Sequence, residues 1–249
     1  MRLTTDGLIV KENNLGDNDR VVVVLTRDRG LVNAFVTGAR RPKSRNAAST
    51  ALLAFSNFVF YKNKEAYNIN EASPIEVFFD LRSDIEKLTV AQYICELCLE
   101  LAPFEENAED FLRLALNSLH FLCKKDIDVQ KIKAVTELRM LCLGGYMPDV
   151  YECANCSKND SFPMHFDLNS GLIYCNSCAN QGRTVMVDKT EYAAMKHIIN
   201  APFEKLYSFN IPHNNAVNLT NITEKYLLAQ TGRRFRTLEF LHSMTFLEN

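Results

Sequence analysis

The chain has 249 residues, of which 47% are hydrophobic, and a formal net charge of −2. This length is enough for one large domain or two to three small ones. No apolar run approaches the ~20 residues that a membrane-spanning helix needs, and no signal peptide is apparent, so we expect a cytoplasmic protein. Residues 1–65 carry eleven Lys and Arg against six Asp and Glu, whereas residues 71–110 carry two against eleven. We therefore expect only the N-terminal part to meet polyanions.

Residues 1–72 contain five short runs that predict β-strands. Their β-branched and aromatic residues are separated by turn-forming residues such as Gly30, which follows Asp28 and Arg29. The five predicted strands are 7–10, 20–26, 31–36, 52–61 and 67–71. Five short strands in about 70 residues fit a small closed barrel, and the OB-fold is the commonest one of this size.

After Pro74 the hydrophobic period changes from 2 to 3.6 residues, which predicts helices. Ser83 and Glu86 have capping-box spacing and predict a helix start, with the helix running to Leu101 before Pro103. Further helices are expected at 107–124, 128–143, 188–200, 221–231 and 237–244. The predicted fold class is α+β, comprising an OB-fold barrel (1–78), a helical domain (79–149 and 183–249) and an inserted zinc ribbon (150–182).

Four cysteines in two Cys-x-x-Cys pairs predict a metal site. Cys153 and Cys156 form the first pair, Cys175 and Cys178 form the second, and eighteen residues separate the two pairs. Two such turns can aim four thiolates at one tetrahedral Zn²⁺ and leave no position for a reactive water, which indicates a structural site. The alternatives are two disulfides or four unrelated thiols, and disulfides would need an oxidising compartment.

The remaining cysteines lie in apolar, helical context. They are Cys95, Cys98, Cys123 and Cys142. Cys95 and Cys98 also have Cys-x-x-Cys spacing, but on a helix they share a face with apolar residues. Buried free thiols are the favoured interpretation, and a redox pair is the alternative.

A run of eight residues from Gly38 to Arg45 predicts a phosphate-binding loop. It holds four cations, Arg40, Arg41, Lys43 and Arg45, and no acid. Arginine matches phosphate oxygens in a bidentate fashion, although a merely solvated charge run is the alternative. Further cations of the barrel could extend the patch: Arg20, Arg27, Arg29, Lys62 and Lys64.

Aromatic residues of the barrel are candidates for base stacking, which OB-folds combine with a basic groove. They are Phe35, Phe55, Phe58, Phe60, Tyr61 and Tyr67. We expect most of them, with Phe58 and Phe60 on one face of their strand, to belong to the core instead.

No catalytic constellation is recognisable in the sequence. There is no phosphate-cradling Gly-rich loop with Lys-Ser/Thr, and the five histidines are scattered. The one dense acidic group, Glu105, Glu106, Glu109 and Asp110, is interpreted as a solvated helix start, which disfavours a nuclease. A second basic run, Arg233, Arg234 and Arg236 after Gly232, could equally contact DNA or follow a helix C-cap.

Several motifs resemble the RecO family of recombination mediators. They are Gly7-Leu8-Ile9-Val10, Asp19-Arg20-Val21-Val22, the Gly38–Arg45 run, Glu137-Leu138-Arg139-Met140-Leu141 before Gly145-Tyr146-x-Pro148, the two cysteine pairs, and Arg233-Arg234-Phe235. The resemblance covers nearly the whole chain in the family's order.

The resemblance implies an OB-fold, a helical domain, a zinc ribbon and a role without enzymatic activity. It implies a nucleoid-associated protein that binds single- and double-stranded DNA, anneals complementary strands and helps RecR load RecA onto strands covered by single-stranded-DNA-binding protein. A zinc-ribbon transcription or RNA-binding factor is the alternative, and it would show sequence or RNA preference. The pI near 6.2 means that DNA binding must depend on a local patch.

The resemblance also implies docking of the acidic, apolar-tipped C-terminal tail of single-stranded-DNA-binding protein. Such a tail needs an apolar pocket with cations at its rim. Lys131, Lys133 and Arg139 offer cations at helical spacing, next to apolar residues such as Met140. We therefore predict that these three residues bind the tail.

Overall fold

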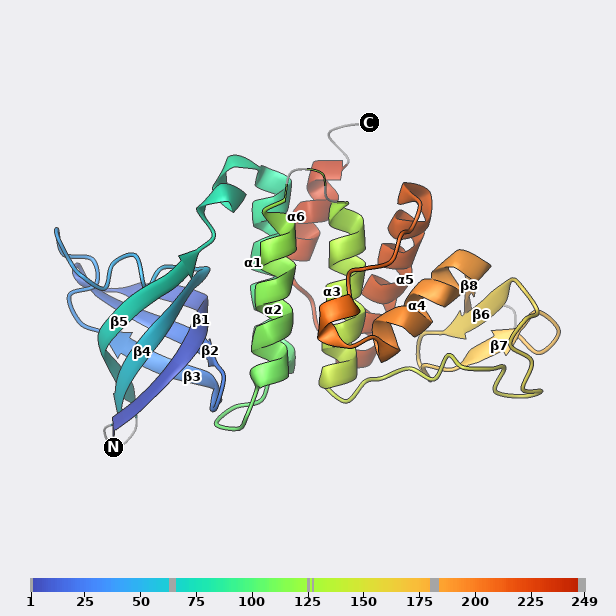
Figure 1. Ribbon diagram of the computed structural model, residues 1–249, viewed down its shortest axis with the longest axis horizontal. Helices are drawn as coiled ribbons and strands as arrows, with labels where there is room; N and C mark the ends of the chain where they lie inside the picture. The colour runs from blue at the N-terminus through green and yellow to red at the C-terminus, as the bar shows by residue number, and fades with distance from the viewer. Residues whose placement is uncertain (1, 63–65, 125, 127, 180–183, 246–249) are drawn as a thin grey trace. The chain divides into compact units, whose positions relative to one another are not determined.

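The computed structural model describes residues 2–62, 66–124, 126, 128–179 and 184–245 (Figure 1). The chain divides into two compact units, a barrel unit (residues 1–125 and 235–249) and a ribbon unit (residues 126–234). The three-part domain boundaries expected from the sequence stay a prediction. Among the described residues, no helix has the length and apolar character needed to cross a membrane.

The barrel unit begins with five strands that close on themselves. They are β1 (Arg2–Leu15), β2 (Asp19–Thr26), β3 (Gly30–Val36), β4 (Ala54–Lys62) and β5 (Tyr67–Val77). The strand order is β1-β2-β3-β5-β4, and β1 closes the barrel by pairing with both β2 and β4. All pairs are antiparallel except β3 with β5. The OB-fold predicted from the sequence is confirmed.

Successive side chains of each strand point alternately into the barrel and away from it, which separates a core from an outer surface. Val22, Val24, Phe58 and Phe60 point into the barrel and are buried, with the Phe58 and Phe60 rings 5.5 Å apart. β1 is much longer than the expected strand 7–10, because its first half pairs with β4 and its second half with β2. This double pairing bends β1 at a register shift between Ile9 and Lys11.

Four helical segments complete the barrel unit. They are η1 (Phe79–Ser83), α1 (Ile85–Leu101), α2 (Glu109–Leu122) and α6 (Arg236–Thr245). The predicted capping box at Ser83 is wrong, because Ser83 ends η1 and its hydroxyl donates to the carbonyl of Asp80. Asp84 caps α1 instead, and its carboxylate accepts a hydrogen bond from the N–H of Lys87.

A close backbone approach joins the barrel to these helices. Gly30 has φ +55°, and a Cβ atom there would lie 2.0 Å from the carbonyl oxygen of Pro103. The neighbouring N–H of Leu31 donates to that same carbonyl at 2.8 Å, and the N–H of Ala108 donates to the carbonyl of Arg27 at 2.9 Å. Only glycine fits this turn, which fixes the β2–β3 end of the barrel against the α1–α2 connection.

The ribbon unit combines three main helices with a small antiparallel sheet. Its elements are α3 (Val129–Leu143), β6 (Met164–Asp167), β7 (Ile173–Cys175), β8 (Thr184–Val187), α4 (Lys189–Asn200), η2 (Phe203–Lys205) and α5 (His213–Thr231). The sheet order is β7-β6-β8. Asp188 caps α4 in a capping box with Glu191, and Gly232 ends α5 at φ +63°.

Candidate metal centre and nucleic-acid interface

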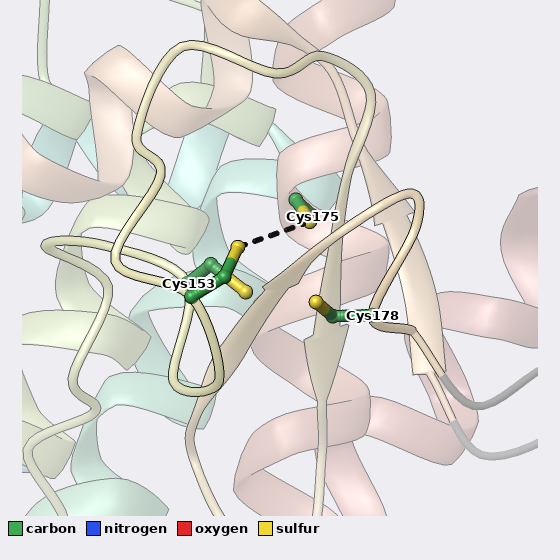
Figure 2. Close-up of side chains that lie close together, drawn as sticks. Cys153, Cys175 and Cys178 are labelled. Atoms are coloured by element: carbon green, nitrogen blue, oxygen red, sulfur yellow. Dashed lines mark hydrogen bonds between the residues drawn. The ribbon is translucent and has the colours of Figure 1, made fainter.

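The four cysteines of the two pairs converge at one end of the small sheet. Cys175 is the last residue of β7, and all four Sγ atoms lie within 4.8 Å of one another. Figure 2 shows the side chains of Cys153, Cys175 and Cys178 pointing toward a common centre. The Sγ atoms of Cys156 and Cys175 are 3.6 Å apart, so these two are not joined by a disulfide.

Two tight turns aim these sulfurs. The N–H of Ser157 donates to the carbonyl of Cys153, and the N–H of Cys178 donates to the carbonyl of Cys175, each at 2.9 Å. Ser157 has φ +57°, which lets the first turn close within a few residues. The two-residue spacing seen in the sequence is therefore the local cause of the cluster.

The crowded thiols have different pKa values, because a thiol that loses its proton makes it harder for its neighbours to lose theirs. Burial, the largest single influence on Cys153, raises its pKa, but the N–H groups of Cys175, Asn155 and Cys156 outweigh burial and lower the pKa to about 6. Hydrogen bonds from the Cys178 thiol to Cys175 and Cys156 raise the pKa of Cys178 to about 12. Four thiolates can coexist here only when a cation neutralises them, so the donor set fits a metal ion.

The predicted burial of Cys95 and Cys98 is confirmed, whereas Cys123 and Cys142 are only partly buried. Cys95 and Cys98 are fully buried in α1, and burial raises the pKa of Cys98 to about 12 and that of Cys95 well above its ordinary value. Burial also raises the pKa of Cys142 to about 11 and, less strongly, that of Cys123. All four are free, unreactive thiols.

The predicted phosphate-binding residues lie on the β3–β4 loop (residues 37–53). Arg41, Lys43 and Arg45 are exposed, and the structure shows no salt bridge to them among the residues that it describes. Arg40 ties the loop to the β1–β2 turn, because its Nη1 donates to the carbonyl of Gly16 at 3.0 Å. The loop holds no acidic residue, so it is a fixed, cationic surface at one end of the barrel.

Arg20 has an internal role that its sequence context did not reveal. Its side chain is only 12% exposed, and Nη1 donates to the carbonyl of Ala47 and the hydroxyl of Thr50, both at 3.1 Å. Arg20 also lies 3.9 Å from the carboxylate of Glu12. The guanidinium of Arg20 therefore binds the β3–β4 loop and does not face solvent.

The remaining predicted cations of the barrel are only partly available. Arg27 lies 3.6 Å from the carboxylate of Asp6, and Arg29 is partly buried. Lys62 forms a 2.9 Å salt bridge with Glu105, and this contact raises the pKa of Lys62. Lys64 lies outside the described residues.

A row of cross-strand neighbours surrounds the barrel and carries two exposed aromatic rings. Directly paired residues point to the same face of a sheet. The row, here called the outer belt, is Arg2, Tyr61, Asn68, Phe35, Val21 and Asn13. Phe35 and Tyr61 are each 40% exposed and flank Asn68, which places them about 10 Å apart from the strand spacing. The sequence analysis did not identify Arg2 as a candidate, because only the register of β1 with β4 places it next to Tyr61.

The residues predicted to bind a partner tail all have partners inside the ribbon unit. Lys131 donates from Nζ to the carbonyls of Tyr207 and Phe209, and Arg139 donates to the last carbonyls of α4, at Ile198 and Ile199. Lys133 is buried and contacts the carboxylates of Glu137 and Glu224, each at 2.8 Å. Because α5 covers Lys133, its ammonium does not face solvent, whereas a cation at the rim of a tail-binding pocket would.

The acidic group at residues 105–110 does not form a metal site. Glu105 pairs with Lys62, and Glu109 and Asp110 lie exposed in the first turn of α2. Among the residues with described positions, the four cysteines are the only group of three or more potential ligands close enough to share a metal ion. In the C-terminal run, Gly232 is the αL C-cap of α5, and Arg233 and Arg234 are exposed directly after it.

Comparison with known proteins identifies the family to which the chain belongs. Residues 1–78 match the family model described as recombination protein O N terminal, and residues 82–239 match that of recombination protein O C terminal. Proteins named DNA repair protein RecO are similar over almost their whole length. Those of Acetivibrio thermocellus and Symbiobacterium thermophilum are 30% and 28% identical, and the alignments cover 97% and 96% of both chains. The chain therefore belongs to the RecO (recombination protein O) family.

Proposed function

We propose that this protein is a mediator of recombinational DNA repair that binds single- and double-stranded DNA, anneals complementary strands, assists RecA loading with RecR and catalyses no reaction. Its relatives carry the name DNA repair protein RecO, which supports a role in repair. The observation that carries the proposal is the β3–β4 loop, where Arg41, Lys43 and Arg45 are exposed, unpaired within the described chain, and held on a rigid barrel. Neutralising phosphates in this way lowers the repulsion between two strands.

The outer belt supports contact with single strands in particular. Unpaired bases expose their faces, and aromatic rings stack on them irrespective of sequence. Phe35 and Tyr61 provide two such rings, with Arg2 beside Tyr61 for the backbone. Of the aromatic residues named from the sequence, these two are the exposed ones, whereas Phe58 and Phe60 are core residues.

The metal is proposed to be a single structural Zn²⁺. A tetrahedral Zn²⁺ with bonds of about 2.3 Å to sulfur separates its ligands by about 3.8 Å, and the spread of the four Sγ atoms fits this geometry. Four protein thiolates complete the coordination, so the metal would hold the ribbon together and activate no water. Cys153, Cys156, Cys175 and Cys178 are the proposed ligands.

The proposed protein partners are RecR and the C-terminal tail of single-stranded-DNA-binding protein. The assignment of the tail to Lys131, Lys133 and Arg139 stays a prediction, and the burial of Lys133 leaves Lys131 and Arg139 as the more accessible cations. The test substitutes Gln at Lys131 and Arg139 only. We expect tail-peptide binding to fall while annealing of bare strands is unchanged, and unaltered peptide affinity would place the tail elsewhere.

An annealing assay tests the proposed function. Two complementary labelled DNA strands are mixed with the protein, with and without Mg²⁺, and both duplex formation and cleavage are scored. We expect faster annealing in either buffer and intact strands throughout. Mg²⁺-dependent cleavage would support a nuclease, and annealing of RNA but not DNA would support an RNA-binding factor.

A further inference from the structure

A groove in the ribbon unit lies outside both sites described above. It has a volume of about 510 Å³ and lies between the small sheet and two helices. Its lining residues are Pro163, Val185, Met186, Asn218, Ile222 and Lys225, with Asp188, Glu191 and Asn221 completing the wall. None of these residues is a metal ligand or belongs to the barrel.

One wall of the groove is the outer edge of β8. β8 is the last strand in the order β7-β6-β8, and it pairs with β6 through Val185 opposite Phe166 and Met186 opposite His165. Consecutive strand residues point to opposite faces, yet both Val185 and Met186 line the groove. The groove therefore runs along the edge of the strand rather than over one face.

Among the described residues, the outer edge of β8 has backbone hydrogen-bonding groups without a partner. In the part of the chain that the structure describes, no hydrogen bond joins the outer edge of β8 to another segment. An open strand edge beside a groove is the arrangement that binds extended peptides by strand addition. Met186 is 66% exposed at this edge, so its side chain is available to contact an added strand.

The opposite wall is one stripe of α5. Asn218, Asn221, Ile222 and Lys225 follow the spacing of residues that share a single helix face. Ile222 is buried and offers an apolar floor, whereas the two amides and the ammonium are exposed. An apolar floor with hydrogen-bonding groups at its rim suits an extended polypeptide.

Hydrogen bonds fix the direction of α5 relative to β8. At one end, Asn215 donates to the carboxylate of Asp188, which follows the last residue of β8, at 2.8 Å. At the other end, Gln230 donates at 2.8 Å to the carbonyl of Leu168, beside Asp167, which pairs with the first residue of β8. The two elements therefore run antiparallel, and the groove has an acidic end at Asp188 and a basic end at Lys225.

We propose that this groove binds an extended segment of a partner protein, which adds to the outer edge of β8 as an antiparallel strand. The N-terminal end of such a strand lies at Asp188 and favours a basic residue, and its C-terminal end lies at Lys225 and favours an acidic one. The stretch between them spans about four residues, the length of β8, and directs an apolar side chain toward Ile222. Antiparallel pairing continues the pattern of the sheet.

A separate extended segment fits better than a second copy of this chain. In a two-fold pairing of β8 with the same strand of another copy, both α5 helices would lie on the same side of the joined sheet. Each would then enter the space that the other lines with Asn218 and Lys225. A lone strand brings no helix with it.

The test measures binding of fluorescent heptapeptides to the full-length chain. An arrayed set carries Lys at the first position, Glu at the last and Val, Thr, Ile or Leu between them, and a control set has Glu first and Lys last. We expect members of the first set to bind roughly tenfold more tightly than their reversed counterparts, because like charges would meet at both ends in the reversed set.

Two changes separate strand addition from unspecific contact. Lys225→Glu should weaken binding of the first set roughly tenfold, whereas Lys205→Glu, an exposed charge reversal outside the groove, should change nothing. Two peptides are methylated on their backbone nitrogens, one at the odd positions and the other at the even positions. Only one of the two should lose binding, because a strand turns every second N–H toward its neighbour. Unchanged metal content and circular dichroism verify that the variants fold.

Three results would overturn the proposal. They are absence of binding by every member of the first set at 1 mM peptide, equal binding of both charge orders, and equal tolerance of both methylation patterns. Formation of a dimer that Met186→Lys dissociates would show that a second copy occupies the edge instead.

Discussion

Lys133 illustrates how burial decides the role of a charged side chain. Burial, the largest single influence, lowers its pKa, but the carboxylates of Glu137 and Glu224 together raise the pKa above its ordinary value, so the ammonium stays charged. Glu137 is fully buried and also accepts a hydrogen bond from the hydroxyl of Thr223. The cluster joins α3 to α5, and its members depend on one another.

Removing this lysine should destabilise the ribbon unit strongly. Lys133→Met leaves the carboxylate of Glu137 buried beside an apolar side chain, and breaking such a pair costs about 3–5 kcal/mol. Urea unfolding monitored by circular dichroism measures the decrease in stability. The double variant Lys133→Met/Glu137→Leu should recover part of it, and a single variant as stable as the parent would contradict the structural role.

Phe35 and Tyr61 should contribute to binding of single strands through stacking. Replacing each with Leu keeps apolar bulk but removes the ring, and loss of a base-stacking ring costs about 1–3 kcal/mol. Fluorescence anisotropy with a labelled oligo(dT) should show weaker binding with an unaltered salt slope, because stacking displaces no counterions. Tyr151→Leu, which removes another exposed ring in the ribbon unit, is the control and should leave affinity unchanged.

Residue roles that depend on register could not be predicted from the sequence. Arg20 resembles its neighbours in the basic patch, and only the path of the β3–β4 loop places Ala47 and Thr50 over its guanidinium. The cysteine ligands were predictable, because Cys-x-x-Cys spacing acts within a single turn. The ammonium of Lys133, in contrast, contacts Glu224 of α5, which is ninety-one positions away, so its burial could not be predicted from local spacing.

At the scale of elements, the segment that carries the cysteines (residues 150–179) has only a small apolar core, which includes Met164, Phe166 and Ile173. The three strands of the small sheet have only four, three and four residues. Phe166 packs its ring 5.0 Å from Tyr226 of α5, and the remaining segment 150–163 is turns. Such a small sheet needs a metal or a disulfide for stability, and its thiols are free.

Removal of one ligand should therefore release the metal and loosen the ribbon alone. For the proposed single Zn²⁺, Cys175→Ser should lower the metal content to well below one ion per chain and increase proteolysis within residues 150–179, while the barrel stays folded. Mass spectrometry of the metal and limited proteolysis measure both effects. Cys123→Ala should retain the metal, and a Cys175→Ser protein with full metal content would contradict the assignment.

The type of an element, helix or strand, could be predicted where the spacing of its hydrophobic residues was clear. The residues at which elements begin and end could not be predicted. α5 begins at His213 rather than 221, since the start 213–221 contains four asparagines of low helix propensity and is held by packing against α3. β5 extends to Val77 rather than 71 because β4 pairs with it along its whole length. The groove beside β8 arises only when the sheet meets α5, so no sequence pattern marks it.

For the whole molecule, the proposed DNA binding depends on how charge is distributed along the chain. Because the net charge of −2 repels DNA overall, this binding requires a local patch of cations, and we propose that the exposed cations of the barrel form it. Binding by a local patch should weaken with salt in proportion to the number of phosphates that the patch neutralises, and it should be insensitive to sequence.

The most direct test of this account is a salt titration of single-strand binding by a loop variant and its matched control. The loop variant replaces Arg41, Lys43 and Arg45 with Gln, and the control replaces the exposed Lys158, Lys189 and Lys205 of the ribbon unit, so the net charge changes equally. We predict that the loop variant alone binds more weakly, with a log–log salt slope lower by up to ~0.7 for each phosphate that the loop no longer neutralises. Equal affinity and slope for the loop variant and the unaltered protein would contradict the claim that this loop binds DNA.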